Sequence, residues 1–399
     1  MVFQRLDNRS LILPCLCCFC WAFGFGLECP LASRWLQDHD CPISAIGYNT
    51  AMHFAGVLFI GFWTPALIRR YGRMTIACGM LLSATGIMLF PLHNNLYYLY
   101  LIRLMTGVGG ALSMIALEST INLHSRDQNR ARNLACYACS VGLGFAFGSS
   151  AGLHFYEIDA VGSFILGGVV TLAGVPLIKW IVPFPREEAM GVSGTLQAPF
   201  LALGSSWCQG FIEAGTLALL PLFLHEKGLS DGGSGTLIGA VLVGTLLAQI
   251  PIGWLADRIG IHNILITCFI GAGIGFALVP FMPGQSGLCG VLLLIGASSG
   301  AFYPLGLALM GERIPQRDIP RANAWFLSCN CFGSLVSPLL SGPIMKQYGS
   351  IAMFWTAECT LVSVLLIWFV LKGRGRFKNW IRRWNPSQIP LRWHNRNSN

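Results

Sequence analysis

Arg126-Asp127-Gln128-Asn129-Arg130-Ala131 recurs 191 positions later as Arg317-Asp318-Ile319-Pro320-Arg321-Ala322. A second related pair, Arg69-Arg70-Tyr71-Gly72-Arg73 and Asp257-Arg258-Ile259-Gly260-Ile261, is separated by 188 positions. All four stretches lie between long apolar runs. A chain built from two copies of one membrane-embedded half is typical of repeat transporters, whose substrate site lies between the halves near the bilayer midplane.

The composition is that of an integral membrane protein. Of the 399 residues, 54% are hydrophobic and 11% are charged, whereas a soluble globular domain has about 25% charged residues. About 20 apolar residues are needed to cross the hydrocarbon as a helix. The sequence predicts twelve such spans, at residues 10–32, 45–68, 74–92, 96–122, 132–154, 160–182, 199–224, 233–256, 262–282, 287–311, 322–345 and 350–372.

We therefore expect an all-α, polytopic membrane protein whose twelve transmembrane helices form two pseudo-symmetric six-helix halves. The predicted N-terminal half is 1–182 and the predicted C-terminal half is 199–372. A short cytoplasmic linker, 183–198, joins them, and a basic cytoplasmic tail, 373–399, follows the last span.

The distribution of lysine and arginine predicts the orientation in the membrane. Counted over alternate connections, 22 basic residues fall on one side and three on the other, while Arg103 lies within a span. Because basic loops stay in the cytoplasm, both termini are predicted to be cytoplasmic.

The basic tail and the cysteines have general explanations. The tail has no acidic residue and interleaves tryptophan with arginine, a composition that favours an anchor on anionic lipid over a nucleic-acid site. The 15 cysteines lie mostly within apolar spans and have no zinc-type spacing, so we expect them to pack as small apolar residues. The sequence has no phosphate-binding GxxxxGK[ST] loop, and we expect no cofactor, no metal and no enzymatic activity.

Two motifs carry a family resemblance. Gly253-Trp254-Leu255-Ala256-Asp257-Arg258-Ile259-Gly260 is similar to the G-x-L-A-D-R-x-G signature of the major facilitator superfamily, and Arg103-Leu104-Met105-Thr106-Gly107-Val108-Gly109-Gly110-Ala111 resembles the R-x-x-x-G-x-G-A pattern of its fourth helix. The resemblance implies the superfamily fold over the whole membrane portion. In the first half, Arg69 stands where the signature has its aspartate.

A narrower resemblance points to bacteria. Glu118-Ser119 followed by Asn129-Arg130-Ala131, and Tyr303-Pro304-Leu305-Gly306-Leu307-Ala308 followed by Arg321-Ala322-Asn323-Ala324, resemble the YcaD-like inner-membrane group. This implies a multi-pass transporter of the bacterial inner (plasma) membrane.

Two acidic residues are candidates for proton coupling or substrate binding. Glu28 in the first span and Glu213 in the seventh are 185 positions apart, which is close to the repeat offset. The resemblance places the first and seventh helices beside the central cavity. A carboxyl group there can be neutral when dry and ionised when hydrated, because burial raises the pKa of a carboxyl group. The alternatives are an acid that binds a polar or cationic substrate without titrating, and a helix-end acid.

Three further polar residues lie inside predicted spans. Arg103 is placed beside the proton route by the resemblance. Glu118 is fifteen residues further along the same span, or ~22 Å, so it cannot pair with Arg103; we expect it to be an inner-end acid that pairs with cytoplasmic arginines. His53 is either a titrating group or a hydrogen-bonded core residue.

Charged residues at the cytoplasmic helix ends form a predicted gate. Asp257 is expected to face the positive helix N-terminus near Arg130–Arg132, and the region of Arg317–Arg321 is expected to face the first-half loop. Such contacts would hold the halves closed on the cytoplasmic side; topology enforcement by the arginines is the simpler explanation. The predicted gate residues are Arg69, Arg70, Arg73, Asp257, Arg258, Arg126, Asp127, Arg130, Arg317, Asp318 and Arg321.

The leading functional hypothesis is secondary active transport of a small solute by alternating access, coupled to a proton or other ion gradient, with efflux favoured over nutrient uptake. We expect a monomer. The alternative is a membrane sensor or lipid scramblase on the same scaffold. Flux that collapses with the proton gradient separates these, because a sensor shows no flux and a scramblase needs no gradient.

Overall fold

The computed structural model describes residues 2–41, 43–184, 199–227, 231–282 and 284–383, and these residues are almost entirely helical. In the first half the helices are α1 (Val2–Asp38), α2 (Ile43–Gly61), α3 (Thr64–Tyr71), α4 (Met74–Leu89), η1 (Phe90–Leu92), α5 (Leu96–His124), α6 (Arg130–Tyr156), α7 (Ala160–Ala173) and η2 (Val175–Trp180). In the second half they are α8 (Phe200–Glu226), α9 (Asp231–Ile259), α10 (Ile261–Leu278), η3 (Val279–Phe281), α11 (Gly284–Ser299), α12 (Phe302–Arg313), η4 (Gln316–Asp318), α13 (Ile319–Tyr348) and α14 (Ala352–Arg383).

Each of the twelve predicted spans coincides with helical structure. Among the described residues, ten helical segments are long and apolar enough to cross a membrane, and the pair α2–α3 makes an eleventh. Some side chains of α8, the remaining predicted span, lie outside the described residues. The all-α membrane fold predicted from the sequence is therefore confirmed.

Two predicted spans are interrupted. The span predicted at 45–68 bends by 57° between α2 and α3. Pro65 lies in the first turn of α3, and a proline cannot continue the hydrogen-bond ladder of the helix before it. The span predicted at 287–311 breaks at a turn between α11 and α12. Most of the predicted linker and the end of the predicted tail lie outside the described residues, and α14 continues to Arg383.

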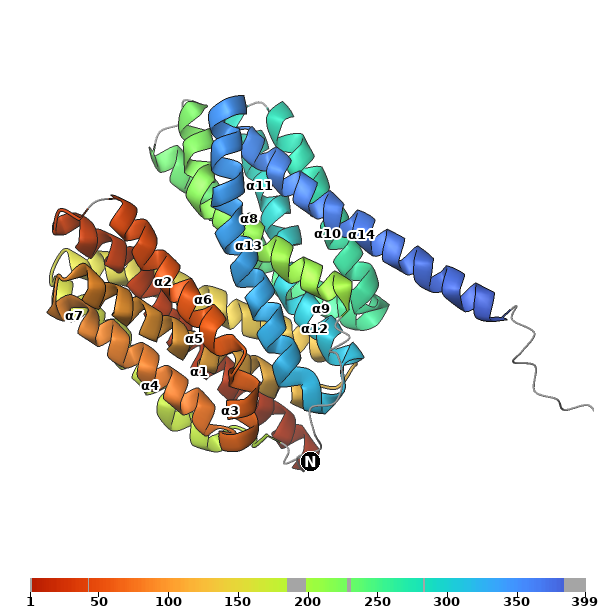
Figure 1. The fold of residues 1–399 in the computed structure, drawn as a ribbon, viewed down its shortest axis with the longest axis horizontal. Coiled ribbons are helices and arrows are strands. Elements are labelled where there is room, and N and C mark those ends of the chain that lie inside the picture. The colour runs from red at the N-terminus through yellow and green to blue at the C-terminus, as the bar shows by residue number, and fades with distance from the viewer. Residues whose placement is uncertain (1, 42, 185–198, 228–230, 283, 384–399) are drawn as a thin grey trace, which may run out of the picture.

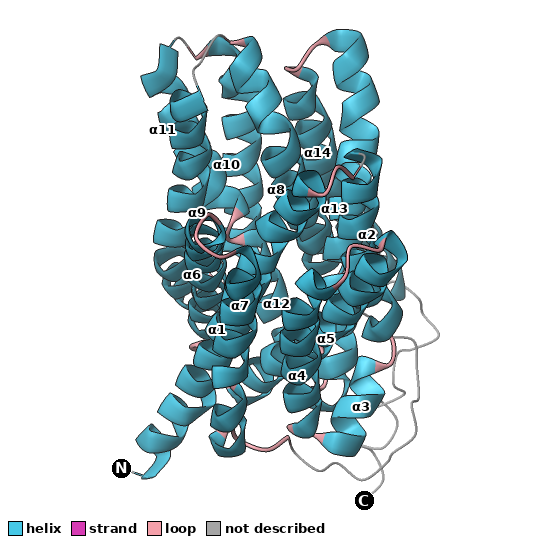
Figure 2. Ribbon diagram, turned by 90° about the vertical axis from the view of Figure 1, so that its left-hand side faces the viewer, coloured by secondary structure: helices cyan, strands magenta, loops and turns pink. Residues whose placement is uncertain are grey.

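The helix pairing repeats between the halves. In the first half α1 packs against α6 and α7, α2 against α5, and α4 against α7. In the second half α8 packs against α13 and α14, α9 against α11, and α10 against α14. Figure 1 shows the two halves as separate bundles that approach each other at one end, and Figure 2 shows their long helices running in broadly the same direction.

Glycines allow the closest helix approach in the first half. Gly144 and Gly148 on α6 lie against the backbone of α1: a Cβ on Gly148 would sit 2.0 Å from the carbonyl oxygen of Phe23, and one on Gly144 would sit 2.5 Å from that of Phe19. Small residues on one helix face let backbones pack without a hydrophobic driving force between helices.

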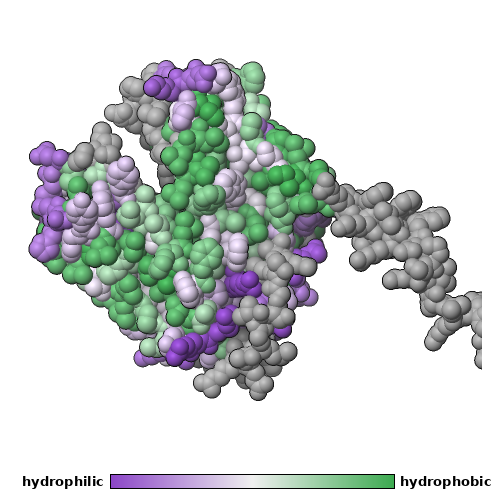
Figure 3. All heavy atoms as spheres, in the orientation of Figure 1, coloured by the Kyte–Doolittle hydropathy of each residue, from purple (hydrophilic) through white to green (hydrophobic). Residues whose placement is uncertain are grey.

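The halves meet at one end and diverge at the other. The contacts between them join α6 to α9 and α12, α5 to α12, and α13 to α2, α3 and α5. The end at which α5 and α12 finish and α6 and α13 begin is called the sealed end. The opposite end is called the open end, and Figure 3 shows the surface hollowed between the halves there. The outer surface carries many exposed large apolar residues, as lipid contact requires.

Candidate functional site

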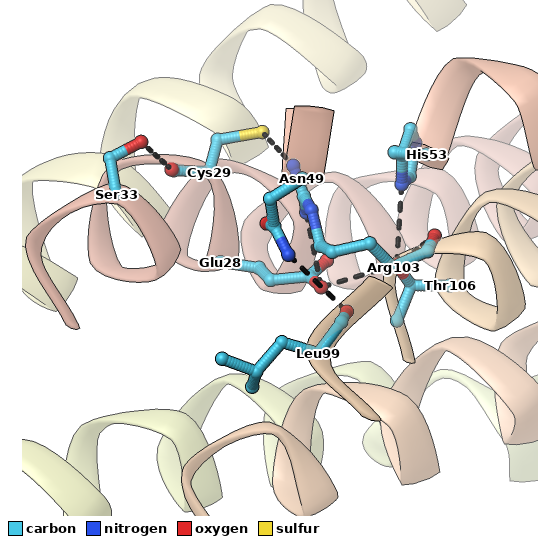
Figure 4. A network of polar contacts seen from close by, with 8 residues as sticks. All are labelled: Glu28, Cys29, Ser33, Asn49, His53, Leu99, Arg103 and Thr106. Atoms are coloured by element: carbon cyan, nitrogen blue, oxygen red, sulfur yellow. Dashed lines mark hydrogen bonds and ion pairs between the residues drawn. The ribbon is translucent and has the colours of Figure 1, made fainter. Parts of the chain in front are cut away.

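A buried ion pair joins α1 to α5 inside the first half (Figure 4). Nη1 of Arg103 lies 3.1 Å from Oε1 of Glu28, and each side chain is only 1% exposed. Arg103 also directs Nη2 toward Sγ of Cys29, at 3.9 Å. Two opposite charges that are buried together avoid the larger cost of burying either alone.

Hydrogen bonds extend this pair toward α2. The hydroxyl of Thr106 donates to Oε1 of Glu28 over 3.1 Å, and Nδ1 of His53 lies 3.2 Å from the same hydroxyl. The ring of His53 stacks on Phe25, with 4.8 Å between centroids. His53 is 4% exposed, so the structure places it in a polar chain that ends on Glu28.

The pair is incompletely satisfied. Nε and Nη1 of Arg103 have no hydrogen-bond partner among the described residues, although Nη1 is within ion-pair distance of Glu28. Buried polar groups in native structures are nearly always hydrogen-bonded, and exceptions often mark functional positions.

Glu213 has different surroundings from Glu28. Among the described side chains of α8 before Glu226, Glu213 alone is exposed, and its hydrogen bond comes from Gln209, over 3.5 Å. The repeat offset of 191 places Leu294 at the position equivalent to Arg103, so the second half has no counterpart of the arginine. Of the two predicted acids, only Glu28 has a basic partner in the described part of the chain.

The prediction that Glu118 pairs with cytoplasmic arginines is wrong. Glu118 is fully buried and its Oε1 accepts hydrogen bonds from the hydroxyls of Tyr303, at 2.6 Å, and Tyr137, at 3.4 Å. The inner part of α5 faces α12 and α13, so this acid points into the interface between the halves and away from the basic loops.

Asp257 lies where the sequence predicted it. Its carboxylate accepts hydrogen bonds from the backbone N–H groups of Ala131, at 2.9 Å, and Arg132, at 3.0 Å. These are orphan donors at the N-terminus of α6, where a negative charge is favourable. Asp257 thereby joins α9 of the second half to α6 of the first.

The other predicted gate residues form contacts mainly within their own half. Arg130 pairs with Asp127 and donates to the carbonyl of Ser125 over 3.2 Å. Arg317 lies 3.6 Å from Asp318. Arg73 donates hydrogen bonds to the carbonyls of Lys179 and Ile181. Arg258 lies over the ring of Trp254, and Arg70 lies over the ring of Tyr71. Arg69 and Arg126 are exposed, and Arg321 is half-buried.

The sealed end has two lines of contact between the halves, which we call seams: one joins α9 to α6 through Asp257, and the other joins α2 and α3 to α13. Arg69 occupies the position equivalent to Asp257. At the second seam Phe62 and Trp325 meet edge to face, with 6.1 Å between ring centroids. The first seam thus includes a carboxylate on backbone amides, and the second includes an aromatic contact.

Sequence reasoning missed several polar contacts across the interface. Nδ2 of Asn122 donates to the carbonyl of Leu307 over 3.0 Å, and Nδ2 of Asn323 donates to the hydroxyl of Ser119 over 3.3 Å. A signal was present, because Tyr303, Asn323 and Ser119 lie within the stretches that carry the YcaD-like resemblance. No group of three or more His, Cys, Asp or Glu residues in the described ranges could hold a metal ion.

Two helical bundles with a repeated helix pairing, in contact at one end, and a buried ion pair within the first half are the architecture expected of a membrane transporter. The Major Facilitator Superfamily model matches residues 14–207 and 202–384. The chain belongs to this family, whose members are transporters and not enzymes, and the resemblance found in the sequence is confirmed.

Relatives and solved structures agree with this assignment. The uncharacterized MFS-type transporter YfkF of Bacillus subtilis (strain 168) is 23% identical over 374 residues, which cover 90% of this chain and 93% of the relative. The uncharacterized MFS-type transporter YcaD of Salmonella enteritidis PT4 is 23% identical over 358 residues, covering 88% and 92%. The crystal structure of the transporter FucP in the outward conformation has a TM-score of 0.75 at 16% identity and covers 91% of this chain and 98% of that one.

Proposed function

We propose that this protein is a proton-coupled secondary transporter that moves a small solute across the bacterial inner membrane by alternating access. The sealed end carries the arginine-rich connections and is therefore the cytoplasmic side. On this assignment the structure is an outward-open state. Reporter fusions at Lys372 and at Arg186 test the orientation: both are expected to give cytoplasmic signals, and a periplasmic signal from either contradicts it.

The observation that carries proton coupling is the buried pair of Glu28 and Arg103. In this state the two charges neutralise each other. A proton that binds Glu28 leaves Arg103 charged and unpaired, which is costly in a dry site. The protein relieves that cost by a change of state that gives Arg103 another partner, and this links proton binding to movement of α1 against α5.

Glu213 is proposed to face the solute. Because α8 packs against α12, α13 and α14, its exposed carboxylate lies toward lipid or toward the cleft between the halves. An acid in contact with lipid is too costly, whereas the water of a cleft stabilises it. A carboxylate with no basic partner among the described residues favours a neutral or weakly cationic solute. We propose that the protein exports such a solute in exchange for protons.

The solute is identified first. Untargeted metabolite comparison of a deletion strain with an overexpressing strain is expected to show compounds that accumulate inside the deletion strain and are depleted on overexpression. Purified protein in proteoliposomes is then expected to move such a compound only while a pH gradient is imposed. Flux of lipid without a gradient, or no flux of any compound, would contradict the proposal and favour a scramblase or a sensor.

Two variants divide the roles of the acids. Glu28→Gln is expected to abolish gradient-driven accumulation and to keep solute exchange, because exchange needs binding but no net proton movement. Glu213→Gln is expected to reduce both, since it removes the group that faces the solute. Loss of accumulation with full exchange in Glu213→Gln would instead make Glu213 the coupling acid.

A further inference from the structure

A second carboxyl group lies at the sealed end, remote from the pair of Glu28 and Arg103. Glu118 is fifteen residues beyond Arg103 on α5, or about 22 Å along the helix. Its side chain is completely buried. Oε1 accepts hydrogen bonds from Tyr303 of the opposite half and Tyr137 of its own half, while Oε2 has no hydrogen-bond partner among the described residues.

Among the described residues, no cation pairs with this carboxyl group. The titratable groups that face it are Tyr137 from α6, Tyr303 from α12, Cys18 from α1 and Cys331 from α13, all of which are neutral in ordinary conditions. The ion pairs between described residues do not include Glu118. A buried carboxylate needs a cation or a proton, so in this state the group is a carboxylic acid.

We propose that Glu118 is a second proton-binding site, and that its proton latches the two halves together on the cytoplasmic side. The acid bridges α5 to α12 through Tyr303 across the interface. The bond from Asn323 to Ser119 and the bond from Asn122 to Leu307 flank it on the same stretch of α5. Glu118 thus places a carboxyl group in a row of polar contacts that joins the two halves.

Opening of the sealed end would ionise this group. When α12 moves away, Tyr303 leaves Oε1 and water reaches the carboxyl group. Hydration stabilises the carboxylate, which loses its proton to the cytoplasm and must regain one before the interface closes. A more alkaline cytoplasm therefore favours the inward-open state. The inference rests on the proposed alternating access only in requiring that this end opens.

The test measures the opening of the sealed end without a solute. Spin labels are placed on cysteines at Gln128 and Gln316, which are both exposed and lie on opposite halves, in a background where the exposed Cys78 and Cys359 are alanine. Pulsed dipolar spectroscopy of the protein in lipid nanodiscs is carried out at pH 6 and pH 8. The ratio of long to short label distances reports the ratio of open to closed molecules.

In the wild-type background the open-to-closed ratio is expected to rise with pH, by at most about tenfold per pH unit because one proton is released. Glu118→Gln, which mimics the protonated acid, is expected to stay closed at both pH values. Tyr303→Phe, which removes the bridging hydroxyl, is expected to be more open at pH 6. The thermal unfolding of each variant confirms that it is folded.

Glu358→Gln is the matched control: Glu358 is a half-buried acid on α14 whose Oε2 also has no hydrogen-bond partner among the described residues, and it belongs to neither proposed proton site, so this variant is expected to keep the pH response of the label distances. A pH response in Glu118→Gln equal to that of the wild type would overturn the second site, as would a closed wild type at pH 8 or an open Glu118→Gln. The proposed function is tested separately by gradient-driven flux. Flux without this pH response would contradict the role of Glu118 and leave the proposed transport function standing.

Discussion

We expect that removing one partner of the buried pair of Glu28 and Arg103 destabilises the fold more than removing both. Glu28→Ala leaves the Arg103 guanidinium buried and unpaired, and breaking a buried pair in this way costs about 3–5 kcal/mol. We expect a clear fall in the unfolding temperature of the purified protein. The double variant Glu28→Leu with Arg103→Met removes both charges and is expected to regain most of the loss. If Glu28→Ala unfolds at the wild-type temperature, the pair makes no net contribution to stability.

The partner of Glu28 could not be predicted at the residue scale. Glu28 and Arg103 were each recognised as costly charges within spans, because that depends only on local hydropathy. Their pairing depends on the rotation of α1 and α5 about their axes, which the spacing of charges along the sequence does not give. Glu118 shows the same limit: its position near a helix end predicted an arginine, but the face of α5 it occupies meets Tyr303.

The contact between α1 and α6 depends on the absence of side chains on one helix face. Gly148→Val places a branched side chain against the carbonyl of Phe23, and overpacking of this kind costs about 1–3 kcal/mol or more. We expect a lower unfolding temperature in detergent. Gly239→Val is the control: it lies within α9, and a Cβ there meets no atom within 4 Å. Equal effects of the two substitutions would show that helix propensity alone is responsible.

The N-terminus of α6 is the element that Asp257 holds. Asp257→Ala removes the acceptor for two backbone N–H groups, and loss of such a cap typically costs about 1 kcal/mol. Because the tie crosses between halves, we expect the sealed end to open more often. Labelling by a membrane-impermeant maleimide of a cysteine at Ala256, which is 1% exposed, should become faster from the cytoplasmic side.

Asp159→Ala provides the comparison for Asp257→Ala. Asp159 caps the N-terminus of α7 through the N–H of Gly162, and its hydrogen bond stays within one half. Labelling at Ala256 should be unchanged in this variant. If both substitutions speed the labelling equally, Asp257 stabilises a helix and has no role in the gate.

At the scale of the whole molecule, the sealed end must open for transport. Ser119 and Asn323 lie on opposite halves with a hydrogen bond of 3.3 Å between their side chains. A disulfide between cysteines at these positions is expected to stop solute flux, and reduction is expected to restore it. A disulfide between Ser341→Cys and Thr356→Cys joins residues of one half that are 2.8 Å apart and should leave flux intact. Flux through the first crosslink would exclude alternating access at this interface.

The overall architecture can be predicted from the sequence, but the end at which the two halves meet cannot. Long apolar spans and the repeat offset specify the helices and the two halves, because burial in lipid acts on every residue of a span. Whether the halves meet at one end or the other depends on a few contacts such as those of Asn122 and Asn323, whose contributions are small against the packing of the whole molecule. The break between α2 and α3 was missed although Pro65 marks it.

The two seams of the sealed end differ, and the difference gives the motion a direction. Asp257 accepts hydrogen bonds from two backbone amides of α6, and hydrogen bonds of this kind are lost after a small displacement. At the other seam the rings of Phe62 and Trp325 touch edge to face, and rings can roll over one another while remaining in contact. The seam of Asp257 then resists opening until its bonds break, whereas the seam of Phe62 and Trp325 can slide without losing contact. Although the two halves are related by a repeat, we expect them to separate unequally at the two seams.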